Sequence, residues 1–341
     1  MESFQRVAGA LAHFPVRVGT LPPGVRLDFE LYVQLPGGFR SLEVRGQVLP
    51  DAAMVALAQR FGETLFVIEA DRGAYLRAVQ DRLTRPNKAS MEELGAFVKE
   101  TALVHVHDLF TRDQLGGAVG DVGRLLEELV DLASSDVSTT ATLLKLSVHD
   151  YYTYNHCVNV AAYAISFAKR IFGNDRRMLL AAGLGGLLHD IGKRSLPWQT
   201  INKPGALSPE EWSAVRKHPE LGADALVDVD GISHDAKLVV LEHHEAFNGS
   251  GYPKGLTGET ISILARVVTI ADVFDALTTN RSYHRAVAPA DAMAKMFAMQ
   301  PGKFDPKLFK AFKGEFRFRN AEALDADFDP CTPQPVLKVK K

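Results

Sequence analysis

The chain has few cysteines, little excess charge and no long uncharged apolar run. Its 341 residues include only Cys157 and Cys331, too few for a disulfide scaffold, so we expect reduced thiols and a cytoplasmic protein. The formal net charge of −2 argues against a globally basic binder of nucleic acid polymers. The absence of a bilayer-length apolar stretch and of a signal-peptide core argues against a membrane protein.

Length and composition predict about two domains with large cores, since 46% of the residues are hydrophobic. The stretch Arg85-Pro86-Asn87 interrupts the helical pattern and marks the first boundary. We therefore predict an N-terminal module over 1–85, a helical linker over 86–140, a main domain over 141–320 and a tail over 321–341.

The N-terminal module has strand periodicity followed by helices. Apolar and polar residues alternate over 25–33, and Pro36-Gly37-Gly38 is typical of a turn into a second strand. A short helix over 51–59, a buried strand over 65–68 and a helix over 75–83 follow. This pattern predicts a small α+β module without recognisable chemistry. A regulatory or dimerisation role and a passive structural role both remain open.

The rest of the chain is mainly α. Helices are expected from Ser90 to about Asp131, with an apolar stripe over 125–132. Such stripes are usually core and sometimes form a dimer seam, so a homodimer remains an alternative.

Seven residues with metal-binding side chains are spread through this helical part. A structural zinc site needs four ligands that are usually rich in Cys, whereas seven imidazoles and carboxylates suit two hard or borderline ions that share a bridge. These residues are His156, His189, Asp190, His218, His243, His244 and Asp272.

The local context of the first four residues is helical. The pair His189-Asp190 follows an apolar run that predicts a buried helix ending at Gly192, where an unpaired carboxylate is costly. His156 shares one face of an amphipathic segment with apolar residues, and a lone His there is more often a core residue than a ligand. A capping box over 208–211 starts a helix that is expected to contain His218 near its far end.

Two further apolar segments end in, or contain, metal-binding side chains. His243 and His244 follow an apolar run, and neighbouring buried imidazoles are uncommon without a cation to share. Asp272 lies in the apolar run 263–277, with Asp275 on the same helical face. A glycine-rich loop over 247–258 precedes that run.

The ordered motifs resemble the HD-GYP family of metal-dependent cyclic di-GMP phosphodiesterases over about residues 143–320. They are His189-Asp190-Ile191-Gly192-Lys193, His243-His244-Glu245, Gly249-Ser250-Gly251-Tyr252-Pro253 and Ala271-Asp272-Val273-Phe274-Asp275-Ala276-Leu277-Thr278.

The resemblance implies a helical HD-type domain with two metal sites that share Asp190. The first site would consist of His156, His189, Asp190 and Asp272, and the second of Asp190, His218, His243 and His244.

The resemblance also implies roles around the metals. Asp190 and Lys193 would be catalytic, Lys193 and Arg281 would contact phosphate, and Asp275 would contact a guanine base. Tyr252, in the Gly251-Tyr252-Pro253 turn, would line the substrate pocket, and this turn would also offer a surface to protein partners.

Two positions depart from the family pattern. Tyr152 stands where some members have a Glu for a third metal, so we predict two metals. His284 stands where the family usually has an Arg, and a neutral imidazole cannot replace a guanidinium fork, which leaves Arg285 as the substitute phosphate contact.

The implied reaction is hydrolysis of cyclic di-GMP to pGpG or GMP in bacterial second-messenger signalling. Two cations about 3.5–4 Å apart can generate hydroxide and neutralise the transition state. Nitrogen and oxygen ligands without thiolate favour iron or manganese, with zinc, nickel, cobalt or magnesium as alternatives. Activity is expected to fall below about pH 6, since imidazoles must lose protons to bind metal. The open alternatives are another cyclic dinucleotide or nucleotide as substrate, and a non-catalytic receptor or docking module.

Overall fold

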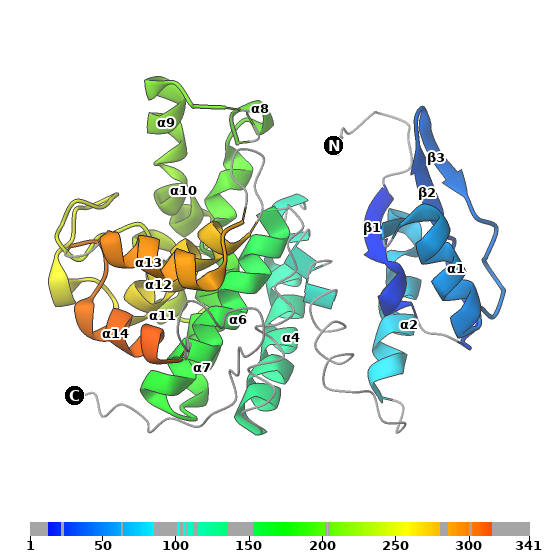
Figure 1. Cartoon of the computed structure of the whole chain (residues 1–341), viewed down its shortest axis with the longest axis horizontal. Coiled ribbons are helices and arrows are strands. Elements are labelled where there is room, and N and C mark those ends of the chain that lie inside the picture. Colours follow the sequence, from blue (N-terminus) through cyan, green and yellow to red (C-terminus); the bar gives the residue numbers. More distant parts are fainter. Residues whose placement is uncertain are drawn as a thin grey trace. The chain divides into compact units, whose positions relative to one another are not determined.

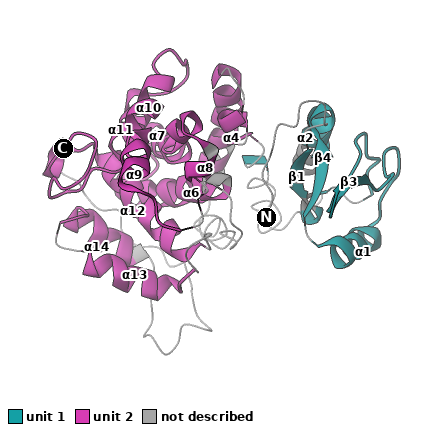
Figure 2. Cartoon of the chain, turned by 90° about the horizontal axis from the view of Figure 1, so that it is seen from above, with its two compact units in different colours: residues 1–104 teal, residues 105–341 magenta. Residues whose placement is uncertain are grey.

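The computed structural model describes residues 13–21, 24–62, 64–84, 101–102, 105–106, 108–111, 115–135, 153–201, 203, 205–279, 286–299 and 302–315. Contacts divide the chain into two compact units, residues 1–104 and 105–341 (Figure 2). The predicted boundaries at residues 86 and 141 and the predicted tail lie outside the described residues and stay predictions.

Unit 1 contains the described strands, and unit 2 is helical, so the mainly α prediction with a small α+β module is confirmed (Figure 1). Unit 1 comprises β1 (His13–Arg17), β2 (Tyr32–Leu35), β3 (Gly38–Ser41), α1 (Asp51–Phe61), β4 (Thr64–Ile68) and α2 (Arg72–Thr84). Unit 2 comprises α4 (Leu115–Ser135), α6 (Thr153–Phe172), α7 (Arg176–Leu188), α8 (Trp198–Ile201), α9 (Pro209–Val215), α10 (His218–Ala225), α11 (His234–Glu242), α12 (Ile263–Thr278), α13 (Pro289–Ala298) and α14 (Pro306–Glu315).

The sheet of unit 1 is antiparallel, with strand order β1-β4-β2-β3. The predicted hairpin at residues 36–38 is confirmed, because Leu35 pairs with Gly38. The alternating segment 25–33 forms a strand only from Tyr32, although its apolar side chains from Leu27 onward are buried. Backbone hydrogen bonds still join Leu27 to Gln47 and Leu31 to Leu42. Between them the carboxylate of Glu30 accepts hydrogen bonds from the backbone N–H groups of Val44 and Arg45, so a side chain satisfies these two donors.

The core of unit 2 is built around α7, which packs against α4, α6, α11 and α12. A Cβ at Gly186 would lie 3.1 Å from the Cα of Ala161 in α6, so the two backbones approach closely there. Leu126, from the apolar stripe of α4, packs against α7 near Gly183 and is buried. Among the described residues we find no helix with the length and apolarity that a membrane crossing requires.

The helix before His189 is shorter than predicted. Helix α7 ends at Leu188, His189 is its C-terminal capping residue, and a 3-10 helix over Ile191–Ser195 follows. Gly192 therefore does not end the helix but lies against the start of α10. A Cβ at this position would overlap the backbone of His218 and Gly222. A close approach of two backbones, rather than a helix stop, explains this glycine.

The capping box at Ser208 and Glu211 is confirmed, but its helix does not contain His218. Helix α9 ends at Val215, and His218 is the first residue of α10. The break follows from Pro219, which has no N–H to donate to the carbonyl of Val215 four residues earlier. That carbonyl accepts a hydrogen bond from Nδ1 of His218 instead, at 2.8 Å.

We predict opposite effects for two glycine substitutions. Gly192→Ala should lower the free energy of unfolding by about 1–3 kcal/mol, since the added methyl group forces α10 away. Gly120→Ala should raise it by up to about 1 kcal/mol, because position 120 is an exposed helical site with open space around it. Urea denaturation of both variants checks this, and equal stability of Gly192→Ala and the wild type would contradict it.

Candidate metal centre

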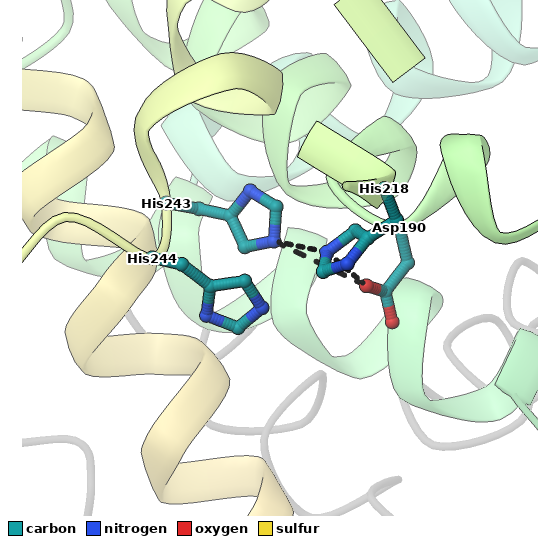
Figure 3. Close-up of side chains that lie close together, drawn as sticks. All are labelled: Asp190, His218, His243 and His244. Carbon is teal, nitrogen blue, oxygen red and sulfur yellow. Dashed lines mark hydrogen bonds and ion pairs between the residues drawn. The ribbon is translucent and has the colours of Figure 1, made fainter. Parts of the chain in front are cut away.

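The structure brings all seven predicted ligands into two neighbouring groups. In one, ligand atoms of Asp190, His218, His243 and His244 all lie within 4.8 Å of one another (Figure 3). In the other, the same holds for His156, His189 and Asp272. The side chains come from α6, the end of α7, the start of α10, the end of α11 and the middle of α12.

Asp190 lies between the two groups and offers one oxygen to each. Its Oδ2 is 3.4 Å from Nε2 of His189, while its Oδ1 is 3.3 Å from Nε2 of His218 and 4.0 Å from Nε2 of His243. The Nζ of Lys193 donates to Oδ2 at 2.6 Å. A carboxylate placed in this way has the geometry of a bridge between two cations.

Three imidazoles are oriented by backbone carbonyls at helix ends. The Nδ1 atoms of His189, His218 and His243 lie 2.7, 2.8 and 2.9 Å from the carbonyl oxygens of the residues three positions earlier. These carbonyls lie in the last turn of a helix, where they lack an intrahelical N–H partner. Because a carbonyl oxygen only accepts, each Nδ1 carries the hydrogen, and each Nε2 presents a lone pair to the centre.

The inward-facing lone pairs lack suitable protein partners in the part of the chain that the structure describes. The Nε2 atoms of His218 and His243 are only 3.1 Å apart, although both are acceptors in these tautomers. The Nε2 of His189 is buried without a hydrogen-bond partner among the described residues. Buried acceptors that face one another need a cation or a proton between them. The donor set therefore fits divalent metal ions.

The charge states of the site also suit a cation. Burial lowers the pKa of His218 to about 4 and that of His244 to about 3, and it lowers the pKa of His243 well below the ordinary value. These imidazoles are neutral at pH 7, as metal ligands must be. Burial is the largest single influence on Asp190 and by itself raises its pKa. The Lys193 ammonium together with the contacts to His189 and His218 outweighs burial, so the pKa of this carboxyl lies well below its usual range.

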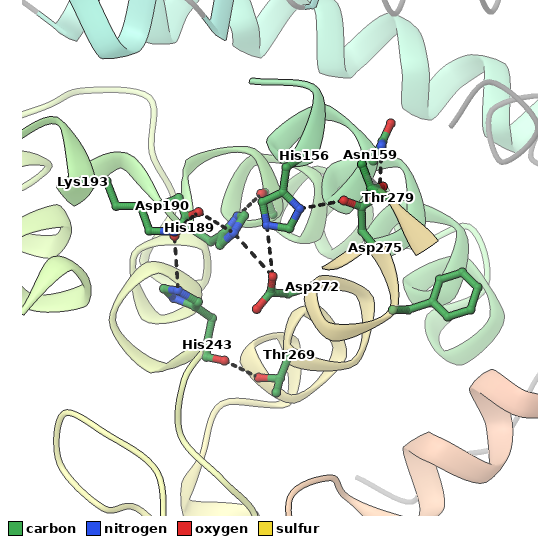
Figure 4. Close-up of polar contacts among 12 residues, drawn as sticks. His156, Asn159, His189, Asp190, Lys193, His243, Thr269, Asp272, Asp275 and Thr279 are labelled. Atoms are coloured by element: carbon green, nitrogen blue, oxygen red, sulfur yellow. Dashed lines mark hydrogen bonds and ion pairs between the residues drawn. The ribbon is translucent and has the colours of Figure 1, made fainter. Parts of the chain in front are cut away.

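Asp275 is not one of the residues that face the candidate metal centre but contacts the far side of the imidazole of His156. Its carboxylate is completely buried and lies 2.7 Å from Nδ1 of His156 (Figure 4). It also accepts hydrogen bonds from Nδ2 of Asn159 at 2.8 Å and from Oγ1 of Thr279 at 3.1 Å. This placement corrects the expected guanine contact, because the oxygens already have protein partners and do not reach the surface. The side chain holds the imidazole of His156 with Nε2 turned toward Asp272, 3.1 Å away.

The glycine-rich loop packs directly against the ligands. The ring of Tyr252 lies 4.7 Å from that of His244, and its backbone N–H donates to the carbonyl of His244 at 3.1 Å. Gly251 allows this approach, since a Cβ there would overlap the backbone of Glu245 and Ala246. The loop is thus part of the site and not an ordinary surface turn.

Sequence reasoning assigned no role to Glu245, which holds this loop. Its buried carboxylate accepts hydrogen bonds from the backbone N–H groups of Lys254 at 2.7 Å and Leu256 at 2.9 Å. The only sequence signal was an acidic residue directly after a buried His pair. Asn159 was also missed, although its position one turn after His156 places both on one helical face.

Four positions discussed for the predicted site lie outside the described residues. They are Arg281 and Arg285, expected to contact phosphate, His284, which stands where the family usually has an Arg, and Tyr152, on which the expectation of two rather than three metals rests. These expectations stay predictions.

Comparison with known proteins identifies the family of the chain. The family model of the HD domain matches residues 125–308, more than half of the chain. Cyclic di-GMP phosphodiesterase PA4108 of Pseudomonas aeruginosa is 38% identical over 234 residues, which is 67% of this chain and 56% of that protein. A cyclic di-GMP phosphodiesterase of Vibrio cholerae is 31% identical over 289 residues, or 78% of this chain and 58% of that protein. The chain thus spans a little over half the length of these two curated relatives.

Another relative is named for a different substrate. The 3'3'-cGAMP-specific phosphodiesterase 3 of Vibrio cholerae is 37% identical over 164 residues, which is 48% of this chain and 35% of that protein.

A solved structure shows the same fold. Bd1817, an HDG"Y"P protein from Bdellovibrio bacteriovorus, superposes with a TM-score of 0.70 at 19% sequence identity, covering 89% of this chain and 98% of that one. The range matched by the family model includes all seven predicted ligands, and the chain belongs to the HD domain family.

Proposed function

We propose that the chain is a phosphodiesterase that hydrolyses cyclic di-GMP with two divalent cations bound at the described centre. The observation that supports this most is the carboxylate of Asp190, whose two oxygens face two separate sets of ligands. The names of the relatives from Pseudomonas and Vibrio support the substrate.

One cation would be held by His156, His189, Asp190 and Asp272, and the other by Asp190, His218, His243 and His244. Nitrogen and oxygen ligands favour iron or manganese, with zinc, nickel, cobalt or magnesium as less suited occupants. When bound, the cations supply positive charge next to the phosphate and lower the pKa of water.

The protein's own side chains position the substrate. Lys193 is partly exposed and lies beside Asp190, so its ammonium offers fixed positive charge where negative charge develops on the phosphate. Arg281 and Arg285 are proposed to extend this contact. Hydrolysis adds water across one P–O bond of the ring and yields linear pGpG, and a second round yields GMP.

We also propose roles for unit 1 and for the glycine-rich loop. Unit 1 would regulate the phosphodiesterase or mediate a homodimer, and the Gly251-Tyr252-Pro253 turn would also contact protein partners. The few cysteines support a role in the cytoplasm, where cyclic dinucleotides act as second messengers.

The test of the function is a metal count and a product assay on protein purified without oxygen. The wild type should contain two metals per chain and convert cyclic di-GMP to pGpG or GMP, followed by chromatography. 3'3'-cGAMP is assayed in parallel. Tight binding of cyclic di-GMP without cleavage under iron and manganese would indicate a receptor, and cleavage of 3'3'-cGAMP alone would reassign the substrate.

Asp190→Asn should abolish both metal binding and hydrolysis. The amide removes the negative charge that the two cations share, and we expect a rate loss on the order of 100-fold or more. Metal content and product formation are measured together. Asp235→Asn is the control, because Asp235 pairs with Arg177 on the surface and does not touch the site. A fully active Asp190→Asn variant would contradict the assignment.

Asp275→Ala should weaken metal binding by about 10–100-fold, because the imidazole of His156 loses the acceptor that orients it. Metal titration by calorimetry and the separate values of kcat and KM check this. The matched control is Asp305→Ala, which also removes a buried, paired carboxylate, the partner of Arg266, and should lower stability without changing metal affinity. A raised KM for cyclic di-GMP with unchanged metal affinity would instead support the guanine contact that the sequence predicts for Asp275.

The metal-free protein should lose stability as the pH falls from about 6.5 to about 4. In this window the unfolded chain protonates its imidazoles, whereas His218 and His244 in the folded protein stay neutral because their pKa values are about 4 and about 3. Each of these two imidazoles then lowers the free energy of unfolding by about 1.4 kcal/mol for every unit by which the pH falls. The carboxyls of Asp190 and Asp272 have lowered pKa values, so their protonation reduces the free energy of unfolding further only below about pH 3.9.

Urea unfolding of chelator-treated protein between pH 7.5 and 4.5 measures this slope, and His244→Gln should flatten it. Stability that does not change over this range would refute the prediction.

A further inference from the structure

A pocket of about 440 Å³ adjoins the metal centre within unit 2. His218, His244 and Lys193 contribute metal-binding and cationic groups to its lining, and Trp212, Tyr252 and Leu207 contribute aromatic and apolar surface. Its volume falls in the range of pockets that hold whole small-molecule ligands, so it exceeds what a phosphodiester group alone requires.

The exposure of Trp212 is not explained by the packing of unit 2. Its side chain is 49% exposed, whereas the phenylalanines that build the core of unit 2, including Phe167, Phe274 and Phe312, are buried. An exposed indole on the wall of a pocket provides a flat apolar surface at little conformational cost to a ligand.

The wall that presents Trp212 is anchored by polar contacts. The carboxylate of Glu211, the preceding residue, accepts a hydrogen bond from the backbone N–H of Ser208 at 2.7 Å, and the Oγ of Ser208 accepts one from the backbone N–H of Glu211 at 3.2 Å. The same carboxylate binds Nζ of Lys203 at 2.7 Å, which ties the segment before α9 to the helix. Helix α9 therefore starts at a defined place, and Trp212 is presented from it.

Tyr252 provides a second aromatic surface that is held in place. Its ring lies 4.7 Å from the ring of His244 at an angle of 32°, and the guanidinium of Arg216 lies 4.6 Å from its centroid. Contacts with both groups hold the ring of Tyr252 where it lines the pocket. One pocket thus combines cationic and metal-binding groups with two flat aromatic side chains.

A ligand that matches this lining has an anionic group joined to a flat, apolar-faced ring, which is the chemistry of a nucleotide. Bases stack on aromatic side chains in a manner that tolerates differences between bases. We infer that this pocket binds a purine base of the cyclic dinucleotide, with Trp212 as the residue on which the base stacks. The inference deepens the proposed function and rests on it for the position of the phosphate that is cleaved.

The test compares Trp212→Ala, Trp212→Phe and the control Phe297→Ala. Phe297 is an aromatic residue of the same unit that is 64% exposed and does not line the pocket. Two probes are titrated by calorimetry into manganese-loaded protein: GMP, which has a base and a phosphate, and inorganic phosphate, which has no base. In a separate assay, kcat and KM are measured for cyclic di-GMP.

Trp212→Ala should raise the Kd for GMP about 10-fold and leave the Kd for inorganic phosphate unchanged. It should raise KM for cyclic di-GMP by a similar factor, with kcat within about 2-fold of the wild type. Trp212→Phe should recover most of the affinity, and Phe297→Ala should behave like the wild type.

The failure of this inference is distinguishable from the failure of the proposed function. If wild-type protein binds GMP in a Trp212-dependent manner but does not cleave cyclic di-GMP, the base site is supported and the proposed substrate is wrong. If cyclic di-GMP is cleaved and Trp212→Ala changes neither the Kd for GMP nor KM, the base site is overturned. An equal loss of affinity for GMP and for inorganic phosphate would also overturn it, because the effect would then lie in the metal centre.

Discussion

The structure of unit 2 depends on one unfavourable arrangement: several lone pairs and carboxylate oxygens face one another in a buried space. The Nε2 atoms of His218 and His243 are 3.1 Å apart, and the oxygens of Asp190 lie beside them. In the protein alone, only Lys193 supplies a direct positive contact to Asp190 among the described residues. Such a set is stable when divalent charge occupies the centre, which is why metal binding and the stability of this domain are expected to be linked.

Helix ends position the ligands more than helix faces do. His189, His218 and His243 each lie at a helix terminus, where a carbonyl that has no helical partner orients the imidazole. The helix break at Pro219 makes this possible for His218. In a continuous helix a backbone N–H would occupy the carbonyl of Val215, to which the imidazole of His218 donates. Because Gly192 has no side chain, the backbone of α10 comes close enough for the imidazole of His218 to reach Asp190.

Buried carboxylates perform three different tasks within this small region. Asp190 and Asp272 face the centre, Asp275 orients a ligand from behind, and Glu245 fixes the loop that places Tyr252 over His244. The pocket beyond them has a different character, with aromatic surface presented from α9. Charge is thus concentrated where the phosphate would react, and apolar surface lies where the rest of a nucleotide would bind.

The sequence by itself determined the fold class, the identities of all seven candidate ligands, the hairpin of unit 1 and the capping box of α9. These features are encoded by local periodicity, by short-range capping signals or by recognisable motifs. The tertiary structure alone decided that α7 stops at Leu188, that Asp275 supports His156, and that Trp212 lines the pocket. His156 and Asp275 are 119 positions apart in the chain, and no local pattern specifies which buried carboxylate meets which imidazole, because that choice depends on how closely packed helices bring their backbones together.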